Sequence, residues 1–262
     1  MRAYVINLAR SPERRASITA QLTKYGVGFE IVEAVDGREL DLEDAAAIAS
    51  IAPSFLSADW FRPTHVACAM SHLNVHRKML ADGLDHALVL EDDVIVPADV
   101  SSVADAVAAS MTGAEIALLN FDSPNVCMMS NRDARELPGS RQLVQPVDIS
   151  QLASGAAYVI TREACERMSK QALPIRAKAD DWDQHCREGR FDNVRCVVPM
   201  VVMKDPRFTS TIGYYSDLSF KARLLRVITR YELQILQHAI ARRRERIWRK
   251  YQQVAFEDDY RG

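Results

Sequence analysis

Apolar runs and amphipathic stretches alternate along the chain. Ala3–Leu8 is rich in β-branched and aromatic residues and predicts a first strand. Ser11–Glu13 then suits the start of a helix, because serine, proline and glutamate favour the first helical positions, and Gly26 suits its end. Phe29–Val35 predicts a second strand. The chain therefore opens as strand–helix–strand, which favours a parallel strand pair with a right-handed crossover.

The same alternation continues through most of the chain. Further helices are predicted over residues 41–49, 66–80, 101–111, 161–170 and 181–189, and further strands over 87–90, 115–120, 156–160 and 194–198. Residues 122–151 are polar and rich in turn residues. This composition predicts that the segment is irregular and mobile. Strands that alternate with helices favour an α/β fold with a mostly parallel central sheet covered on both faces.

The C-terminal part follows a different pattern. Apolar residues recur at helical spacing from Leu224 to Ala239, and the opposite face is rich in arginine. Residues 221–250 hold ten basic and two acidic residues, so this segment carries +8 and the rest carries −10 within a net charge of −2. We therefore divide the chain into an α/β domain over 1–217 and a basic helical extension over 218–262.

Composition narrows the class of protein. With 262 residues, 48% of them hydrophobic and 26% charged, the chain is typical of a globular protein and is not a disordered one. The nearly neutral total excludes an electrostatic nucleic-acid binder. The five cysteines include no CxxC pair, which predicts reduced thiols and neither a disulfide framework nor a zinc site. No secretory leader and no apolar run of about 18 residues is evident, so we expect a cytoplasmic protein.

The basic extension allows three interpretations. A basic amphipathic helix over 221–250 would bind an anionic membrane surface, which would place the protein peripherally on the inner face of the membrane. It would alternatively pack on the acidic body of the same chain. It would also serve as a contact in a homodimer.

Three adjacent carboxylates give the strongest chemical signal. Glu91, Asp92 and Asp93 directly follow the apolar run Ala87–Leu90. Ligands of open α/β sheets bind outside the carboxyl ends of strands. In an extended chain residues two apart face the same way, so Glu91 and Asp93 would project together. A hard divalent cation would neutralise such a pair, which predicts an E-x-D metal site, although an exposed acidic strand end is the simpler alternative.

Other segments carry weaker signals. Asn7, Arg10 and Arg14 lie where the first strand enters a helix, a position that favours anions, but no glycine-rich phosphate loop accompanies them. His72 and His76 are one helical turn apart, and we favour packed histidines over metal ligands because no HExxH pattern surrounds them.

Two more segments suit a ligand site. Ser154 and Gly155 precede a strand, where the glycine would allow close approach of a ligand or form a bulge. Asp180 and Asp181 precede a predicted helix. One of them is either an N-cap or a general base, with Trp182 as a platform for a sugar ring.

These segments together resemble glycosyltransferase family 25, which includes lipopolysaccharide galactosyltransferases and collagen galactosyltransferase domains. The matching segments occur in the same order over roughly residues 3–215, and they are residues 4–8 with Arg10, Arg14 and Arg15, then 33–37, 68–72, 88–94, 155–160 and 180–182. The resemblance implies a GT-A-like fold that binds a nucleotide sugar. It also implies transfer of a hexose, typically galactose from UDP-galactose, to a hydroxyl of a glycan or lipid-linked glycan acceptor with inversion of configuration, as in lipopolysaccharide synthesis.

The resemblance also suggests roles for the candidate residues. Glu91 and Asp93 match the acidic motif that would bridge Mn²⁺ or Mg²⁺ to the diphosphate. The remaining donor-site candidates are Asn7, Arg10, Arg14, Asp92, Ser154 and Gly155. Asp181, or its neighbour Asp180, is our own candidate for the general base. Two other classes remain open, a metal-dependent phosphohydrolase using the acidic triplet and a non-catalytic scaffold bound to a membrane through its basic helix.

Overall fold

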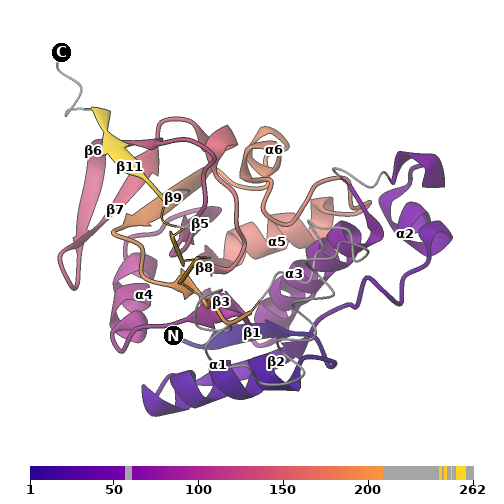
Figure 1. Ribbon diagram of the computed structural model, residues 1–262. Helices are drawn as coiled ribbons and strands as arrows, with labels where there is room; N and C mark the ends of the chain where they lie inside the picture. The colour runs from indigo at the N-terminus through magenta and orange to yellow at the C-terminus, as the bar shows by residue number, and fades with distance from the viewer. Residues whose placement is uncertain (57–60, 209–241, 244, 247–248, 250–251, 258–262) are drawn as a thin grey trace.

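The computed structural model describes residues 1–56, 61–208, 242–243, 245–246, 249 and 252–257 (Figure 1). The strands in these ranges are β1 (Ala3–Asn7), β2 (Phe29–Glu33), β3 (His86–Glu91), β4 (Val94–Ile95), β5 (Glu115–Leu118), β6 (Cys127–Leu137), β7 (Arg141–Pro146), β8 (Ala157–Thr161), β9 (Asn193–Val198), β10 (Met203–Lys204) and β11 (Val254–Phe256). The α-helices are α1 (Pro12–Lys24), α2 (Leu42–Ala49), α3 (Pro63–Ala81), α4 (Val100–Ala108), α5 (Arg162–Gln171) and α6 (Trp182–Arg187). Short 3-10 helices cover Pro53–Phe55 and Ile149–Gln151.

One large sheet dominates the described part of the chain. Its nine strands lie in the order β11-β6-β7-β9-β5-β8-β3-β1-β2, and β10 pairs separately with β4. Seven of the nine strands run in the same direction, whereas β7 and β8 are each antiparallel to both of their neighbours. The predicted α/β class with a mostly parallel sheet is confirmed.

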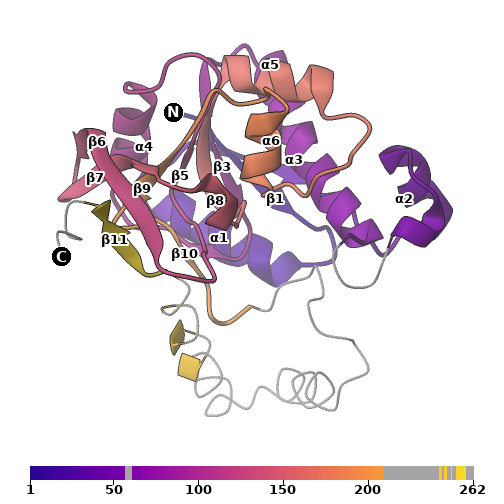
Figure 2. The same cartoon turned by 90° about the horizontal axis from the view of Figure 1, so that it is seen from above.

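Helices cover both faces of this sheet, as the alternating pattern predicted (Figure 2). Tyr4 and Ile6 of β1 belong to a core cluster that includes residues of α2, α3, α5 and α6. The intervening residues, Ala3 and Val5, belong to the opposite cluster with α1 and α4. Because successive side chains of a strand point to opposite faces, one short strand contributes to two hydrophobic cores.

The first strand–helix–strand unit follows the sequence closely. Pro12 occupies the first turn of α1, and Gly26 follows the helix with a φ of +66°, a conformation that favours glycine. β1 then pairs in parallel with both β2 and β3. The carboxyl ends of β1 and β3 therefore lie side by side.

The prediction of an irregular stretch over 122–151 is wrong for its central part. β6 and β7 form an antiparallel hairpin that turns at Gly139, where φ is +74°. Met129, Leu143 and Val144 of this hairpin are buried. The polar residues between them obscured the strand pattern, because only part of this surface contacts the core.

Most of the predicted C-terminal basic helix lies outside the described residues, and the division into 1–217 and 218–262 stays a prediction. Residues 254–256, which the sequence assigned to this extension, form β11 and pair in parallel with β6. No helix within the described ranges is both long enough and apolar enough to span a membrane. The five cysteines are all unpaired with one another, in agreement with the prediction of free thiols.

His185 of α6 is a buried histidine held in its neutral form. Its Nε2 lies 3.1 Å from the carbonyl oxygen of Lys178 and its Nδ1 lies 2.7 Å from the Arg190 guanidinium, so Nε2 donates and Nδ1 accepts. Burial, together with the positive charge of Arg190, lowers the pKa of His185 to about 4. Protonation of the ring would place the Nδ1–H of His185 against the N–H groups of Arg190, so that two donors would face each other.

This arrangement predicts acid sensitivity. The unfolded chain binds a proton at His185 below its ordinary pKa of about 6.5, whereas the folded chain does not until about pH 4. The neutral His185 therefore contributes fully to the free energy of unfolding above about pH 6.5. This contribution, roughly 3 kcal/mol, is lost as the pH falls towards 4. Chemical denaturation across this range should show a shallower pH dependence for His185→Gln than for the wild type, and parallel curves would contradict the prediction.

Candidate active site

A cleft opens where β1 and β3 end, between the start of α1 and one face of α3. Its lining includes four carboxylates, two arginines, a thiol and an imidazole, contributed by Arg10, Arg14, Asp36, Cys68, His72, Glu91, Asp92 and Asp93. This is the position at which open α/β sheets bind ligands. The fold therefore brings the acidic triplet and the first strand–helix junction together in one cleft.

Asp92 is held by the first strand–helix unit. Its side chain is 7% exposed and accepts from the Asn7 amide at 2.7 Å and from the Arg14 guanidinium at 3.0 Å. The Asn7 amide also donates to the backbone oxygen of Ser11. Asn7 and Arg14 thus offset part of the cost of burying Asp92 and fix the acidic turn against α1, although burial still raises the pKa of Asp92 above its ordinary value.

Asp93 is in a less favourable environment. Arg14 reaches one of its oxygens at 3.2 Å, but no group among the described residues bonds the other oxygen, Oδ1, which is buried. Burial, followed by the negative charge of Glu91, raises the pKa of Asp93 to about 7. A buried carboxylate oxygen without a partner, beside a second carboxylate, is a suitable ligand for a divalent cation.

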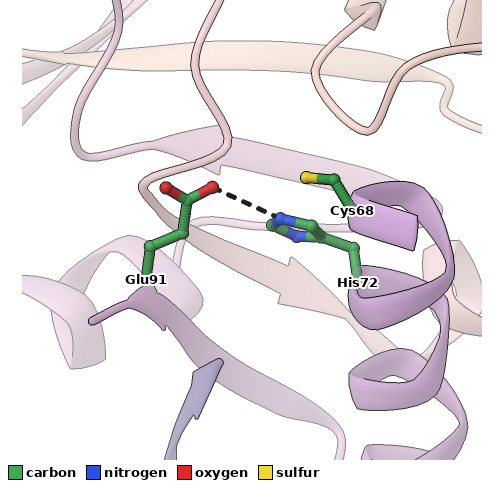
Figure 3. A group of neighbouring side chains, drawn as sticks. All are labelled: Cys68, His72 and Glu91. Carbon is green, nitrogen blue, oxygen red and sulfur yellow. Dashed lines mark ion pairs between the residues drawn. The ribbon is translucent and has the colours of Figure 1, made fainter. Parts of the chain in front are cut away.

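The pKa of Glu91 is shifted in the opposite direction to that of Asp93. Burial alone would raise its pKa, but the hydrogen bond and charge of His72, with smaller effects of Lys204 and Arg14, hold the pKa of Glu91 below its ordinary value. His72 Nε2 lies 3.5 Å from Glu91 Oε1 (Figure 3). Lys204 of β10 also forms an ion pair with Asp122. Lys204 therefore adds a positive charge near the acidic pair that the sequence analysis missed.

The two histidines of α3 differ in role. Both contact the buried Tyr158 hydroxyl at 2.9 Å, His72 through Nδ1 and His76 through Nε2. Burial, with the charges of His72 and His185, lowers the pKa of His76 to about 3. The interpretation as a packed histidine is confirmed for His76. His72 instead joins the packed core to Glu91 in the cleft.

Ser154 and Gly155 lie against this group. Ser154 has a φ of +90°, and its hydroxyl donates to Asn120 while its backbone N–H donates to Asp180. A Cβ on Gly155 would lie 3.1 Å from Cε1 of His72 and 3.8 Å from Oε1 of Glu91. The glycine therefore permits the close approach of these two side chains, and its predicted contact with a ligand stays a prediction.

Asp180 and Asp181 have different surroundings. The Asp181 carboxylate caps α6 by accepting from the Gln184 N–H at 3.3 Å. Asp180 instead accepts from Ser154 at 2.9 Å, and its charge contributes, after burial and Glu91, to a pKa of the Cys68 thiol well above the ordinary value. Asp180 is thus the carboxylate of this pair on the side of Cys68 and Ser154.

The proposed role of Trp182 as a sugar platform is wrong. Its side chain is buried, and its ring packs against Tyr158, His185 and Phe191. A residue at the first position of an amphipathic helix can face the core as easily as the cleft, and the sequence did not distinguish the two.

Arg10 lies at the outer side of the cleft. It forms an ion pair with Asp36, and about a third of its side chain remains exposed. The side chain of Arg14, in contrast, is 7% exposed and forms ion pairs with Asp92 and Asp93. The two arginines predicted to lie near the donor therefore differ, since Arg10 faces solvent and Arg14 stabilises the acidic turn.

The comparisons with known proteins agree with this picture. The family model described as glycosyltransferase family 25 (LPS biosynthesis protein) matches residues 1–182. This match spans the first strand–helix unit, the acidic triplet and Asp180. The fold is that of an α/β protein with an acidic cleft at the carboxyl ends of its strands, and the chain belongs to glycosyltransferase family 25.

Curated relatives match over shorter segments. The chain is 33% identical over 96 residues to the lacto-N-neotetraose biosynthesis glycosyltransferase LgtB of Neisseria meningitidis serogroup B, an alignment covering 37% of this chain and 34% of the relative. It is also 33% identical over 95 residues to the mouse "Inactive glycosyltransferase 25 family member 3", covering 35% of this chain and 16% of the relative. The chain thus matches about a third or less of the length of these relatives.

A solved glycosyltransferase involved in the glycosylation of the major capsid of PBCV-1 aligns with 74% of this chain and 79% of its own. The identity is 10% and the TM-score is 0.34. A similarity of this size assigns no function.

The hydrogen bonds around Asp92 predict that replacing Arg14 strongly destabilises the folded protein. Replacement of Arg14 by methionine would leave the Asp92 carboxylate buried beside a single amide donor, which should lower the free energy of unfolding by about 3–5 kcal/mol. The matched control is Arg15→Met, because Arg15 is exposed on the same helix and its loss should change stability by less than about 0.5 kcal/mol. Denaturant titration of both variants would measure this, and similar small losses would contradict it.

Proposed function

We propose that the chain is a metal-dependent glycosyltransferase of GT-A-like fold that transfers a hexose from a nucleotide sugar to a hydroxyl of a glycan. The observation that carries this proposal is the pair Glu91 and Asp93 in the cleft, with one buried Asp93 oxygen that no described group bonds. Within family 25, such a pair at the end of β3 is suited to a donor diphosphate and its cation.

The donor and acceptor follow from the family resemblance. We propose UDP-galactose as donor, and as acceptor a glycan or lipid-linked glycan of lipopolysaccharide or another cell-surface polysaccharide. The support is the match to a family described by lipopolysaccharide biosynthesis and to the Neisseria LgtB relative. A nucleic-acid substrate is not part of this proposal.

The cation would be Mn²⁺ or Mg²⁺, held by Glu91 and Asp93. The chemistry of these residues fits the group, because hard cations prefer carboxylate oxygens and an added positive charge would relieve the repulsion that raises the Asp93 pKa. When bound, it would neutralise charge on the departing diphosphate. Arg10 and Lys204 contribute further positive charge on the same side, and Arg14 with Asn7 fixes the acidic turn.

Asp180 is the general base in this mechanism. Its carboxylate takes the proton from the acceptor hydroxyl, whose oxygen forms a bond to the anomeric carbon while the bond from that carbon to the UDP oxygen breaks. Attack opposite the leaving group inverts the configuration. Asp180 is favoured over Asp181 because Asp181 caps α6, whereas Asp180 lies beside Ser154 and influences Cys68 in the cleft.

The setting of the reaction is also a proposal. We place the protein in the cytoplasm, peripherally on an anionic membrane surface through residues 221–250, where a lipid-linked acceptor would be available. Packing of this segment on the body of the chain, or in a homodimer, remains the alternative. The mouse relative named as inactive makes a non-catalytic member the competing function.

Kinetics of two neighbouring variants test the proposed base. With UDP-galactose and a galactose-accepting glycan, Asp180→Asn should lower kcat by about 10²–10⁴-fold, because the variant no longer accepts the acceptor proton. Asp181→Asn should keep kcat within a few fold of the wild type. The asparagine amide oxygen should still cap α6, so the free energy of unfolding should change by less than about 0.5 kcal/mol.

The measurement is release of UDP together with formation of the glycosidic product. If Asp181→Asn is the variant that loses turnover, the two roles are reversed. If the wild type forms no product with any UDP-hexose in the presence of Mn²⁺, the non-catalytic alternative is favoured. Release of UDP without a glycosidic product would indicate a hydrolase.

A further inference from the structure

Three potential metal ligands of different chemistry converge in the cleft. Cys68 and His72 lie one turn apart on α3, and Glu91 lies at the end of β3 (Figure 3). One ligand atom from each, the thiol sulfur, an imidazole nitrogen and a carboxylate oxygen, lie within 4.8 Å of one another. The cysteine spacing predicts no zinc site because it contains no CxxC pair, whereas this group joins two separate elements of the fold.

The spacing suits a shared ion. In a tetrahedral Zn²⁺ site the nitrogen and oxygen ligands lie about 2.0–2.2 Å from the metal and therefore about 3.4 Å from each other. His72 Nε2 and Glu91 Oε1 are 3.5 Å apart. The Cys68 sulfur lies within 4.8 Å of the other two ligand atoms. In a tetrahedral Zn²⁺ site a sulfur and a nitrogen ligand are about 3.6 Å apart, so the sulfur would have to approach by no more than roughly 1.2 Å.

The surroundings hold His72 in the required orientation. Its Nδ1 lies 2.9 Å from the Tyr158 hydroxyl, so in the metal-bound form Nδ1 can donate there and Nε2, which faces Glu91, loses its proton and becomes the ligand atom. A metal-bound histidine commonly donates its other N–H in this way. The absence of a side chain at Gly155 leaves room beside Nε2, since a Cβ there would lie 3.3 Å from it. Cys68, His72 and Glu91 also line the cleft, which leaves a position open to solvent.

We propose that Cys68, His72 and Glu91 form a site for a borderline transition-metal cation of the Zn²⁺ class. This site shares Glu91 with the hard-cation pair Glu91 and Asp93 and differs from it in its thiolate and imidazole ligands. Thiolate and imidazole ligands favour Zn²⁺ and Co²⁺ over Mn²⁺ and Mg²⁺. Because both sites use Glu91, occupation of one withdraws this carboxylate from the other. The site does not depend on sugar transfer and would exist in a non-catalytic member of the family.

Titration of the metal-free full-length chain with Co²⁺, without nucleotide sugar, tests the proposal. We expect saturable binding with tetrahedral visible bands and a thiolate-to-cobalt charge-transfer band, abolished by Zn²⁺ but retained in an equal concentration of Mn²⁺. Cys68→Ser should lose the charge-transfer band and bind Zn²⁺ at least about tenfold more weakly. The matched control is Cys186→Ser, because Cys186 is another partly buried helical cysteine outside this group.

A second variant keeps the test valid if Cys68→Ser does not fold. Gly155→Ala retains all three ligands but places a methyl group against His72, so it should weaken Zn²⁺ binding about tenfold with an unchanged circular dichroism spectrum. Absence of a charge-transfer band in the wild type, or its retention in Cys68→Ser, would overturn the proposal and leave His72 and Glu91 as a simple hydrogen-bonded pair. Because no donor or acceptor is present, these results are independent of transferase activity.

Discussion

The contact of Arg14 with Asp92 and Asp93 is the interaction on which the site depends. Three consecutive carboxylates at the end of a buried strand repel one another and lose hydration, and such charges are costly without compensation. Arg14 supplies that compensation from the first turn of α1, and Asn7 supplies a second donor from the end of β1. The parallel pairing of β1 with β3 places both beside the triplet. The compensation is incomplete at Asp93, which lines the cleft and whose buried Oδ1 has no partner among the described residues.

Glu91 links the other half of the site to the core. It contacts His72, which contacts the buried Tyr158, which contacts His76. Tyr158 in turn packs against Trp182, next to the two aspartates that begin α6. A continuous series of packed polar and aromatic groups therefore connects the end of β3 with the segment that carries Asp180. This packing supports Glu91 at the end of β3 and the segment before α6 that carries Asp180.

The sequence predicted the features that depend on local pattern. The strand–helix–strand opening, the helices on both faces and the position of the acidic triplet follow from periodicity and capping residues close to each element. It failed for the β6–β7 hairpin, where burial of Met129 and Leu143 depends on distant strands. It also failed for Trp182, whose burial depends on Tyr158 and Phe191. The grouping of Cys68 with Glu91 depends on how α3 packs beside β3, whereas the spacing of four residues between Cys68 and His72 was visible in the sequence.

In the proposed mechanism the cleft binds a nucleotide sugar through a cation held by Glu91 and Asp93. Calorimetric titration of the protein with UDP-galactose, with and without Mn²⁺, tests it most directly. We expect UDP-galactose to bind only in the presence of Mn²⁺ and this binding to be lost in Asp93→Asn. The control Asp85→Asn should retain binding, because the Asp85 side chain is 83% exposed to solvent. Equal binding with and without Mn²⁺, or unchanged binding in Asp93→Asn, would contradict it.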